Sequence, residues 1–173
     1  QLGILLIHIE AFEITQECID SLEITVYRDK QIYLLENASA NLSALKLFLR
    51  NPLVHMLFAT ARSSYCNSFN LLADFAIRDG SHYLFVSNND TRGHSPKIFN
   101  NLISEIDNQF GMVSPVIYDF EHVLLRSDMV THFGVQFSLA TEAYVIPAKL
   151  WQEVDGFTNA FNIYCEDVDL LLR

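Results

Sequence analysis

Short apolar segments alternate with amphipathic segments along most of this chain, and this alternation limits the folds that the chain can adopt. The apolar segments are Leu2–Ile9, Gln31–Leu35, Val54–Ala59 and His82–Val86. Continuous apolar runs of this length are typical of strands that are buried on both faces. The sequence therefore predicts an α/β fold of the Rossmann-like type, in which a mainly parallel sheet is flanked by helices.

Helices are expected between and after these strands, over Thr15–Tyr27, Leu42–Leu49, Ser68–Arg78 and Ser95–Gln109. Thr15 is the expected N-cap of the first helix, and Gly80 is the expected stop after the third. The rhythm then changes, and we expect a strand over Met112–Tyr118, irregular structure over Asp119–Leu139, a short strand over Ala143–Ile146 and a short helix over Pro147–Glu153. Long loops in compact domains tend to be functional, so Asp119–Leu139 is the best candidate for a ligand-facing loop.

Composition restricts the class of protein further. A length of 173 residues, half of them hydrophobic, predicts a single domain over residues 1–173. The net charge of −10 disfavours nucleic acid as a partner. No apolar run approaches the roughly 18–20 residues of a transmembrane segment. Three cysteines without a C-x-x-C pair indicate a reducing compartment. We therefore expect a cytoplasmic protein, and peripheral attachment to a membrane is compatible with that location.

The predicted strands end in segments that contain polar or charged residues. These segments are His8-Ile9-Glu10 at the end of the first strand, Glu36 and Asn37 after the second, Arg62 after the third, and Asn88, Asn89 and Asp90 after the fourth. In open α/β sheets, ligands bind beyond the carboxyl ends of the strands. Any one of these segments is an ordinary polar loop, but four in series favour a single shared site.

Two segments carry acids that suit specific chemistry, one near the end of the chain and one among the strand ends. Near the end of the chain, Glu166, Asp167 and Asp169 follow an aromatic, apolar run, where an unpaired carboxylate would be costly. Upstream, Asp90 and Asn88 offer hard oxygen ligands, which Mg²⁺ and Mn²⁺ prefer, above all when the phosphates of a ligand complete the shell. A turn capped by its own side chains is the ordinary alternative for this second segment.

Several segments together resemble the motifs of one enzyme family. Leu35-Glu-Asn-Ala-Ser39 is similar to its V-D-N-x-S turn, and Tyr83-Leu-Phe-Val-Ser-Asn-Asn-Asp-Thr91 is similar to the strand that ends in its metal-binding D-x-D. Val154-Asp-Gly-Phe157 and Phe161-Asn-Ile-Tyr-Cys-Glu-Asp-Val-Asp-Leu170 resemble its G-G-F-D-E…F-x-x-x-E-D-x-D-L block, which is the most specific match. The chain therefore resembles a family 2 glycosyltransferase of the GT-A fold, closest to the rhamnosyltransferase-like branch.

The resemblance implies transfer of a sugar, with inversion, from a nucleoside diphosphate donor to a hydroxyl group of a glycan, a lipid-linked molecule or another acceptor. It implies Mn²⁺ or Mg²⁺ at Asp90, Asp167 as the general base, and Glu166 as the residue that positions the acceptor. Asp169 is expected to brace the last helix. The residues implied on the nucleotide side are His8, Ile9, Glu10, Glu36, Asn37, Arg62, Asn70, Asn88 and Asn89.

Departures from the family pattern favour a second hypothesis, a GT-A-like module that binds nucleotide or sugar without turnover. The first strand ends in His8-Ile9-Glu10 where T-Y-N is typical, and Glu36 replaces an Asp. Arg62 and Ser64 stand where an Asn and a Gly are typical. A third hypothesis, a nucleotidyltransferase, requires a Gly-rich basic loop near the N-terminus, which the sequence lacks. Because family members continue past the acidic block, we expect this domain to be truncated after Arg173.

Overall fold

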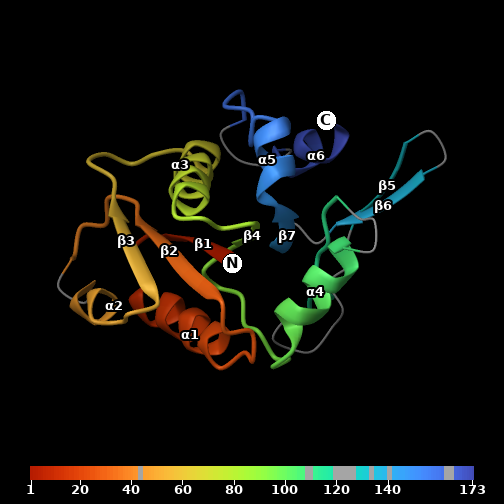
Figure 1. Ribbon diagram of the computed structural model, residues 1–173. Helices are drawn as coiled ribbons and strands as arrows, with labels where there is room; N and C mark the ends of the chain where they lie inside the picture. The colour runs from red at the N-terminus through yellow and green to blue at the C-terminus, as the bar shows by residue number, and fades with distance from the viewer. Residues whose placement is uncertain (43–44, 108–110, 119–127, 133–134, 140–141, 162–165) are drawn as a thin grey trace.

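The computed structural model describes residues 1–42, 45–107, 111–118, 128–132, 135–139, 142–161 and 166–173. Its elements are β1 (Leu2–His8), α1 (Phe12–Glu23), β2 (Lys30–Glu36), α2 (Lys46–Leu49), β3 (Val54–Phe58), α3 (Tyr65–Arg78), β4 (Tyr83–Ser87), α4 (Ile98–Asp107), β5 (Asp128–His132), β6 (Val135–Leu139), β7 (Ala143–Pro147), α5 (Ala148–Glu153) and α6 (Glu166–Leu172). Five strands form one sheet in the order β3-β2-β1-β4-β7, in which β7 is antiparallel to β4 and the other pairs are parallel. The predicted α/β class, with a mainly parallel sheet flanked by helices, is confirmed (Figure 1).

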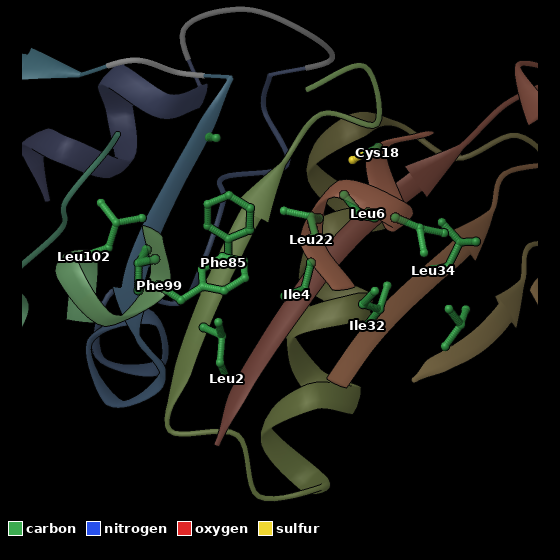
Figure 2. Packing of buried hydrophobic residues seen from close by; sticks show 14 of the residues in the cluster. Leu2, Ile4, Leu6, Cys18, Leu22, Ile32, Leu34, Phe85, Phe99 and Leu102 are labelled. Atoms are coloured by element: carbon green, nitrogen blue, oxygen red, sulfur yellow. The ribbon is translucent and has the colours of Figure 1, made fainter. Parts of the chain in front are cut away.

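Side chains alternate between the two faces of the sheet, and each face has its own hydrophobic core. Leu2, Ile4 and Leu6 of β1 pack with residues of α1, α2 and α4 on what we call the α1 face (Figure 2). Leu5 packs with residues of α3, α5 and α6 on the opposite side, the α3 face. In Figure 1, α1 and α2 accordingly lie on one side of the sheet and α3 on the other.

Gly3 allows α3 to pack directly on β1. A Cβ atom at Gly3 would lie 2.9 Å from the Cβ of Ala76 and 2.9 Å from the Oγ of Ser81. Such contacts are too short for any side chain, so this approach of helix and strand requires glycine. The close packing fixes α3 over the sheet, with its first residue, Tyr65, at the carboxyl end of the strands.

The parallel register brings the carboxyl ends of the strands to one edge. His8 at the end of β1 pairs with Glu36 at the end of β2, and Glu36 pairs in turn with Phe58 of β3. On the other side, β4 ends at Ser87, which pairs with Ala143, the first residue of β7. The polar segments that follow β1, β2 and β4 therefore lie along the same edge, which we call the carboxyl edge.

Two predictions for the region after α4 are wrong. Met112–Tyr118 is not a continuous strand: Val113 forms an isolated antiparallel bridge with Val145, and Pro115, which has no N–H, interrupts further pairing. The second error concerns Asp119–Leu139, which is not irregular throughout, because β5 and β6 pair within it as antiparallel strands. The alternation of apolar and polar residues along Val135–Leu139 is typical of a strand and could have predicted β6. Residues 119–127 and 133–134 lie outside the described part of the chain.

The predicted N-cap of the first helix is also wrong. α1 begins at Phe12 and its N-cap is Ala11, so Thr15 lies inside the first turn. The hydroxyl of Thr15 lies 3.1 Å from the carbonyl oxygen of Ala11 and does not cap the backbone of its own helix. The predicted stop after α3 is confirmed, since α3 ends at Arg78 and Gly80 has a φ of 93°. Among the residues that the structure describes, no helix has the length and hydrophobicity that a bilayer crossing requires.

Lys30, the first residue of β2, closes the turn that follows α1. Its side chain is only 6% exposed, and its Nζ donates to the carbonyl oxygens of Glu23, Thr25 and Tyr27 at 3.0–3.1 Å. It also donates to Thr25 Oγ1 at 2.8 Å. Because the last carbonyls of a helix have no partners within the helix, Lys30 caps the C-terminus of α1 and joins it to the sheet.

We predict that Lys30→Met lowers the free energy of unfolding by about 2–3 kcal/mol, because several buried carbonyl oxygens lose their donor. Urea unfolding followed by circular dichroism measures the change. Lys149→Met is the control, because the Lys149 side chain is 88% exposed and its loss should change stability by less than about 0.5 kcal/mol. Equal effects of the two substitutions would contradict the capping role of Lys30.

Candidate functional site

His8, Thr15 and Glu36 form a buried polar group at the carboxyl edge, on the α1 face of the sheet. Strand alternation places His8 and Glu36 on the same face as the core residues Leu6 and Leu34, and the register places them side by side. His8 is 1% exposed and Glu36 is 2% exposed. His8 Nδ1 lies 2.8 Å from Thr15 Oγ1, and His8 Nε2 lies 3.6 Å from Glu36 Oε2.

The surroundings of His8 determine which of its nitrogens carries the proton. We assign the proton of the neutral ring to Nε2, because the other tautomer would set a lone pair against the Glu36 carboxylate. The Thr15 hydroxyl has two acceptors within reach, His8 Nδ1 at 2.8 Å and Ala11 O at 3.1 Å, and we assign its one proton to the shorter contact with His8 Nδ1. Burial lowers the pKa of His8 below its ordinary value of 6.5, and the charges of Glu36 and Glu10 oppose that shift.

The loops that follow β1 and β2 are bonded to each other. Glu10 and Ala38 both have a φ of 58°, which is uncommon for residues other than glycine. Glu10 N donates to Ser39 Oγ at 2.9 Å, and Glu10 Oε1 accepts from Ala40 N at 2.5 Å. Glu36 Oε1 accepts from Ser39 N at 2.5 Å. Glu10 therefore joins the two loops, whereas the Glu36 carboxylate bonds the loop that follows its own strand.

Asn37 and Asn70 each bond a neighbouring backbone segment through both ends of the side-chain amide. Asn37 Nδ2 donates to Ser63 O at 3.0 Å and Asn37 Oδ1 accepts from Ser63 N at 2.8 Å. Asn70 forms the same pair of bonds with the backbone of Phe157, both at 2.9 Å. The preceding Gly156 has a φ of 59°, and a Cβ there would lie 2.5 Å from Asn70 Oδ1. The two asparagines thus fix the loop after β3 and the turn after α5.

The remaining residues that the resemblance implied on the nucleotide side differ in accessibility. Ile9 is partly buried and Arg62 is exposed. Asn88 and Asn89 are partly buried at the end of β4. Contacts of any of these residues with a nucleotide, like those of His8, Glu10, Glu36, Asn37 and Asn70, remain predictions.

The loop that follows β4, residues 88–93, lies along α1. Asn89 Nδ2 donates to Thr15 Oγ1 at 2.8 Å, and Gly93 N donates to Ser21 Oγ at 3.0 Å. Thr15 and Ser21 are six residues apart on one helix, so the loop is attached to α1 at both of its ends. Asp90 lies between these attachments with an exposed side chain, and within the described residues no hydrogen bond or ion pair engages its carboxylate.

A second polar group lies on the α3 face of the same edge. Tyr65 opens α3, Tyr144 lies on β7, and Glu166 opens α6. Tyr144 Oη and Glu166 Oε2 are buried, and neither has a hydrogen-bond partner within the described residues. Burial raises the pKa of Glu166, and the neighbouring charge of Asp167 adds to this shift.

Tyr65 connects this group to the loop after β4. Its hydroxyl donates to Asn88 Oδ1 at 3.4 Å, and Asn88 N donates to Glu142 O at 2.9 Å. Burial raises the pKa of Tyr65, and the nearby charges of Glu166 and Asp167 raise it further. The sequence analysis missed Tyr65; the only available signal was its position just after a polar strand end.

Asp169 has a different environment from the other two acids of α6. Its Oδ2 lies 2.8 Å from Arg173 Nη2, an ion pair one helical turn apart. Arg173 also donates to the carbonyl oxygens of Val154 at 2.6 Å and Gly156 at 2.8 Å. These contacts agree with the expectation that Asp169 braces the last helix.

Within the described residues, no three side chains of His, Cys, Asp or Glu converge in a way that would hold a metal ion. The oxygens that fit a hard divalent cation are the exposed carboxylate of Asp90 and the side-chain amide oxygen of Asn88. Proteins often bind Mg²⁺ through one or two such ligands when substrate phosphates supply the rest. The donor set therefore fits a cation that arrives with a diphosphate rather than one held by the protein alone.

A pocket of about 540 Å³ lies at the opposite edge of the sheet, between the start of β4 and the start of α5. His82, Pro147 and Lys149 are among its lining residues. None of the predicted site residues lines it. We place the candidate site at the carboxyl edge, because the buried acids and the polar strand ends are there.

Solved structures resemble this fold, whereas no protein-family model and no curated protein matches the sequence. A structure of S. aureus TarS residues 1–349 matches with a TM-score of 0.72 and 8% identity, over 99% of this chain and 54% of that chain. The mannosyltransferase PcManGT from Pyrobaculum calidifontis, in complex with GDP-Man and Mn²⁺, matches with a TM-score of 0.67 and 15% identity. The match covers 91% of this chain and 47% of that chain. TarS 1–349 in complex with UDP-GlcNAc matches with a TM-score of 0.67 and 10% identity, over 91% of this chain and 48% of that chain.

The chain has the fold of the GT-A glycosyltransferases. It spans about half the length of the structures that it matches. At these identities the likeness establishes the fold. The expected GT-A architecture is therefore confirmed, and the activity has to be argued from the residues of the carboxyl edge.

The buried position of His8 predicts how stability depends on pH. In the unfolded chain His8 takes up a proton near pH 6.5, whereas the folded chain resists protonation until the pH is lower. Unfolding therefore takes up a proton in this range, and the free energy of unfolding should fall as the pH drops below about 6.5.

Urea unfolding between pH 7.5 and pH 5.5 measures this dependence. His8→Asn retains an acceptor near Nδ1 but has no group that titrates in this range, so the decrease should be smaller in this variant. An equal decrease in the two proteins would contradict the assignment of a buried, neutral His8.

Proposed function

We propose that this chain is the donor-binding and catalytic part of an inverting glycosyltransferase, which moves a sugar from a nucleoside diphosphate to a hydroxyl acceptor. The finer placement, in family 2 and near its rhamnosyltransferase-like branch, rests on the motifs of the sequence. The observation that carries the proposal is the meeting of two polar segments at one edge. The hydroxyl of Tyr65 donates to Asn88 Oδ1 in the loop after β4, and Glu166 and Asp167 of α6 are near enough for their charges to raise the pKa of Tyr65.

The proposed role of Asp167 follows from the chemistry of the acceptor. A sugar hydroxyl is a weak nucleophile, and a positioned carboxylate assists it by removing its proton as the new bond forms. Asp167 is partly exposed in the first turn of α6, and its Oδ1 accepts from Val168 N at 2.8 Å. The more deeply buried Glu166 is 8% exposed, which suits a residue that positions the acceptor. Inversion requires the base on the side of the sugar opposite the leaving group.

The proposed cation would be held by Asp90, with Asn88 beside it. A bound Mn²⁺ or Mg²⁺ would offset the charge that develops on the leaving diphosphate. The residues of this chain that bear on its position are those that fix the loop: Thr15, Ser21 and the backbone of Glu142. The complex of PcManGT with GDP-Man and Mn²⁺ supports a cation on this fold.

The alternative proposal is a module that binds nucleotide or sugar without turnover. It is favoured by the internal bonds of Glu10, Glu36 and Asn37, which occupy polar groups on the nucleotide side of the edge. Both proposals expect nucleotide binding. They differ in whether Asp167 affects transfer of the sugar.

We predict that the chain binds a nucleoside diphosphate in a Mn²⁺-dependent way and that Asp90→Ala abolishes this dependence, because the exposed carboxylate is lost. Calorimetry with UDP-, GDP- and dTDP-sugars, with and without Mn²⁺, tests the binding. Asp74→Ala is the control, since Asp74 is an exposed acid of α3 outside the carboxyl edge. Mn²⁺-dependent binding that survives in Asp90→Ala would exclude this residue as the ligand.

We also predict that Asp167→Asn lowers the rate of sugar transfer by about 100-fold or more, while donor affinity stays within about twofold of the wild type. The change keeps the shape of the side chain and removes its basicity. Transfer is measured as release of nucleoside diphosphate in the presence of acceptor. Asp169→Asn is the control within the same helix and should retain transfer. If neither variant alters a measured transfer rate, Asp167 is not the base; donor binding without any transfer would favour the binding module.

A further inference from the structure

The loop that carries Asp90 is attached to α1 through hydrogen bonds that continue to the end of β1. Asn89 Nδ2 donates to Thr15 Oγ1 at 2.8 Å, and Thr15 Oγ1 lies 2.8 Å from His8 Nδ1. His8 Nε2 faces Glu36 Oε2 at 3.6 Å. With the tautomer assigned above, both hydrogen bonds run the same way, from Asn89 through Thr15 to His8, and His8 Nε2–H faces the Glu36 carboxylate beyond hydrogen-bond distance. Bonds that are aligned in this manner strengthen one another.

Thr15 is the residue that these two hydrogen bonds share. Its side chain is completely buried, and its hydroxyl is the only side-chain atom among those described that contacts both the strand end at His8 and the loop at Asn89. The neighbouring Cys18, one turn further along α1, has its thiol 3.9 Å from Asn88 O and from Thr91 Oγ1. Contacts at these distances are weak. Arg92 also pairs with Glu17 of α1 at 2.5 Å, but Glu17 is 66% exposed, so Thr15 provides the buried attachment next to Asp90.

We propose that Thr15 is a positioning residue for the Asp90 loop: its hydroxyl, oriented by His8, holds Asn89 and so sets where the neighbouring carboxylate meets a cation and a diphosphate. The inference rests on the proposed function, because it concerns Mn²⁺-dependent binding of a nucleoside diphosphate. It adds a residue that neither contacts the ligand nor belongs to the acidic motif. The same hydrogen bonds connect the end of β1, where His8 lies, with the loop after β4.

The arrangement has a direct consequence for substitutions of Thr15. Thr15→Val keeps the shape of the side chain but removes the hydroxyl, which leaves Asn89 Nδ2 without its acceptor. The loop then loses the attachment at Asn89, while those of Arg92 to Glu17 and of Gly93 to Ser21 remain. Thr15→Ser retains the hydroxyl and should retain the position of the loop.

Calorimetric titration of the 173-residue chain with UDP, GDP and dTDP, in Mn²⁺ and in EDTA, tests the proposal. Thr15→Val should weaken Mn²⁺-dependent affinity by about tenfold, the equivalent of roughly one hydrogen bond, and should leave any binding in EDTA unchanged. Thr15→Ser should restore the affinity to within about twofold of the wild type. Asn89→Ala removes the other partner of the same bond and should match Thr15→Val, which keeps the test decisive if Thr15→Val does not fold.

Thr25→Val is the matched control for a general loss of stability. Thr25 is 1% exposed, and its hydroxyl also has two partners: it donates to Leu22 O at 2.8 Å and accepts from Lys30 Nζ at 2.8 Å. It lies at the end of α1 away from the Asp90 loop, so this variant should lose stability but keep Mn²⁺-dependent affinity.

The outcomes separate this inference from the proposed function. Wild-type affinity in Thr15→Val or in Asn89→Ala, or an equal loss in Thr25→Val, would overturn the positioning role alone. A wild-type chain that binds none of the three nucleotides in Mn²⁺ would overturn the proposed function, and the positioning role with it.

Discussion

The parallel pairing of β1 with β2 and with β4 is the constraint on which the rest of the structure depends. It brings the ends of three strands to one edge and sets His8 directly beside Glu36. Because side chains alternate along a strand, the same register decides that these two residues lie on the α1 face, within reach of Thr15. A shift by one residue in either strand would turn one of the two side chains to the α3 face and separate the group.

Buried polar groups at this edge are stabilised mostly by the chain itself. Burial of a carboxylate costs free energy unless hydrogen bonds or opposite charges compensate for it, and Glu36 receives a backbone N–H from Ser39. Its second oxygen, like Tyr144 Oη and Glu166 Oε2, has no hydrogen-bond partner within the described residues, although His8 Nε2 lies 3.6 Å from it. Buried atoms without a hydrogen bond are uncommon in folded proteins and tend to occur where a ligand or ordered water completes the bonding. Gln31 Nε2, near the opposite edge, is also without one, so these atoms do not by themselves locate a ligand.

The sequence predicted the parts of the fold that depend on local pattern. Apolar runs located β1, β2, β3 and β4, and the polar residues after them located the carboxyl edge. Local pattern could not predict the role of Thr15, because a threonine near a helix start is most often a cap, and only tertiary packing shows that its hydroxyl faces His8 and Asn89. For the same reason the sequence could not show that Asn37 and Asn70 bond backbone groups, since an amide that bonds a backbone and one that bonds a ligand have the same sequence signal. Tyr65 was missed because its position next to Asn88 depends on the packing of α3 over Gly3.

The division of the carboxyl edge between two faces bears on how a reaction could be organised there. On the α1 face, Thr15 and His8 hold the loop that presents Asp90, whereas on the α3 face burial and the neighbouring charge of Asp167 raise the pKa of Glu166. An edge with this many carboxylates would repel a diphosphate, so a diphosphate donor would require a cation there, while the same negative potential would suit removal of a proton from an acceptor. In the proposed function, the loop after β4 meets the first requirement and α6 meets the second. Tyr65 bonds Asn88 of that loop, and the charges of Glu166 and Asp167 raise its pKa. This separation would allow one acidic edge to bind an anionic donor, because the acid proposed for the cation is exposed at the loop and the acids proposed for the acceptor lie on the opposite face.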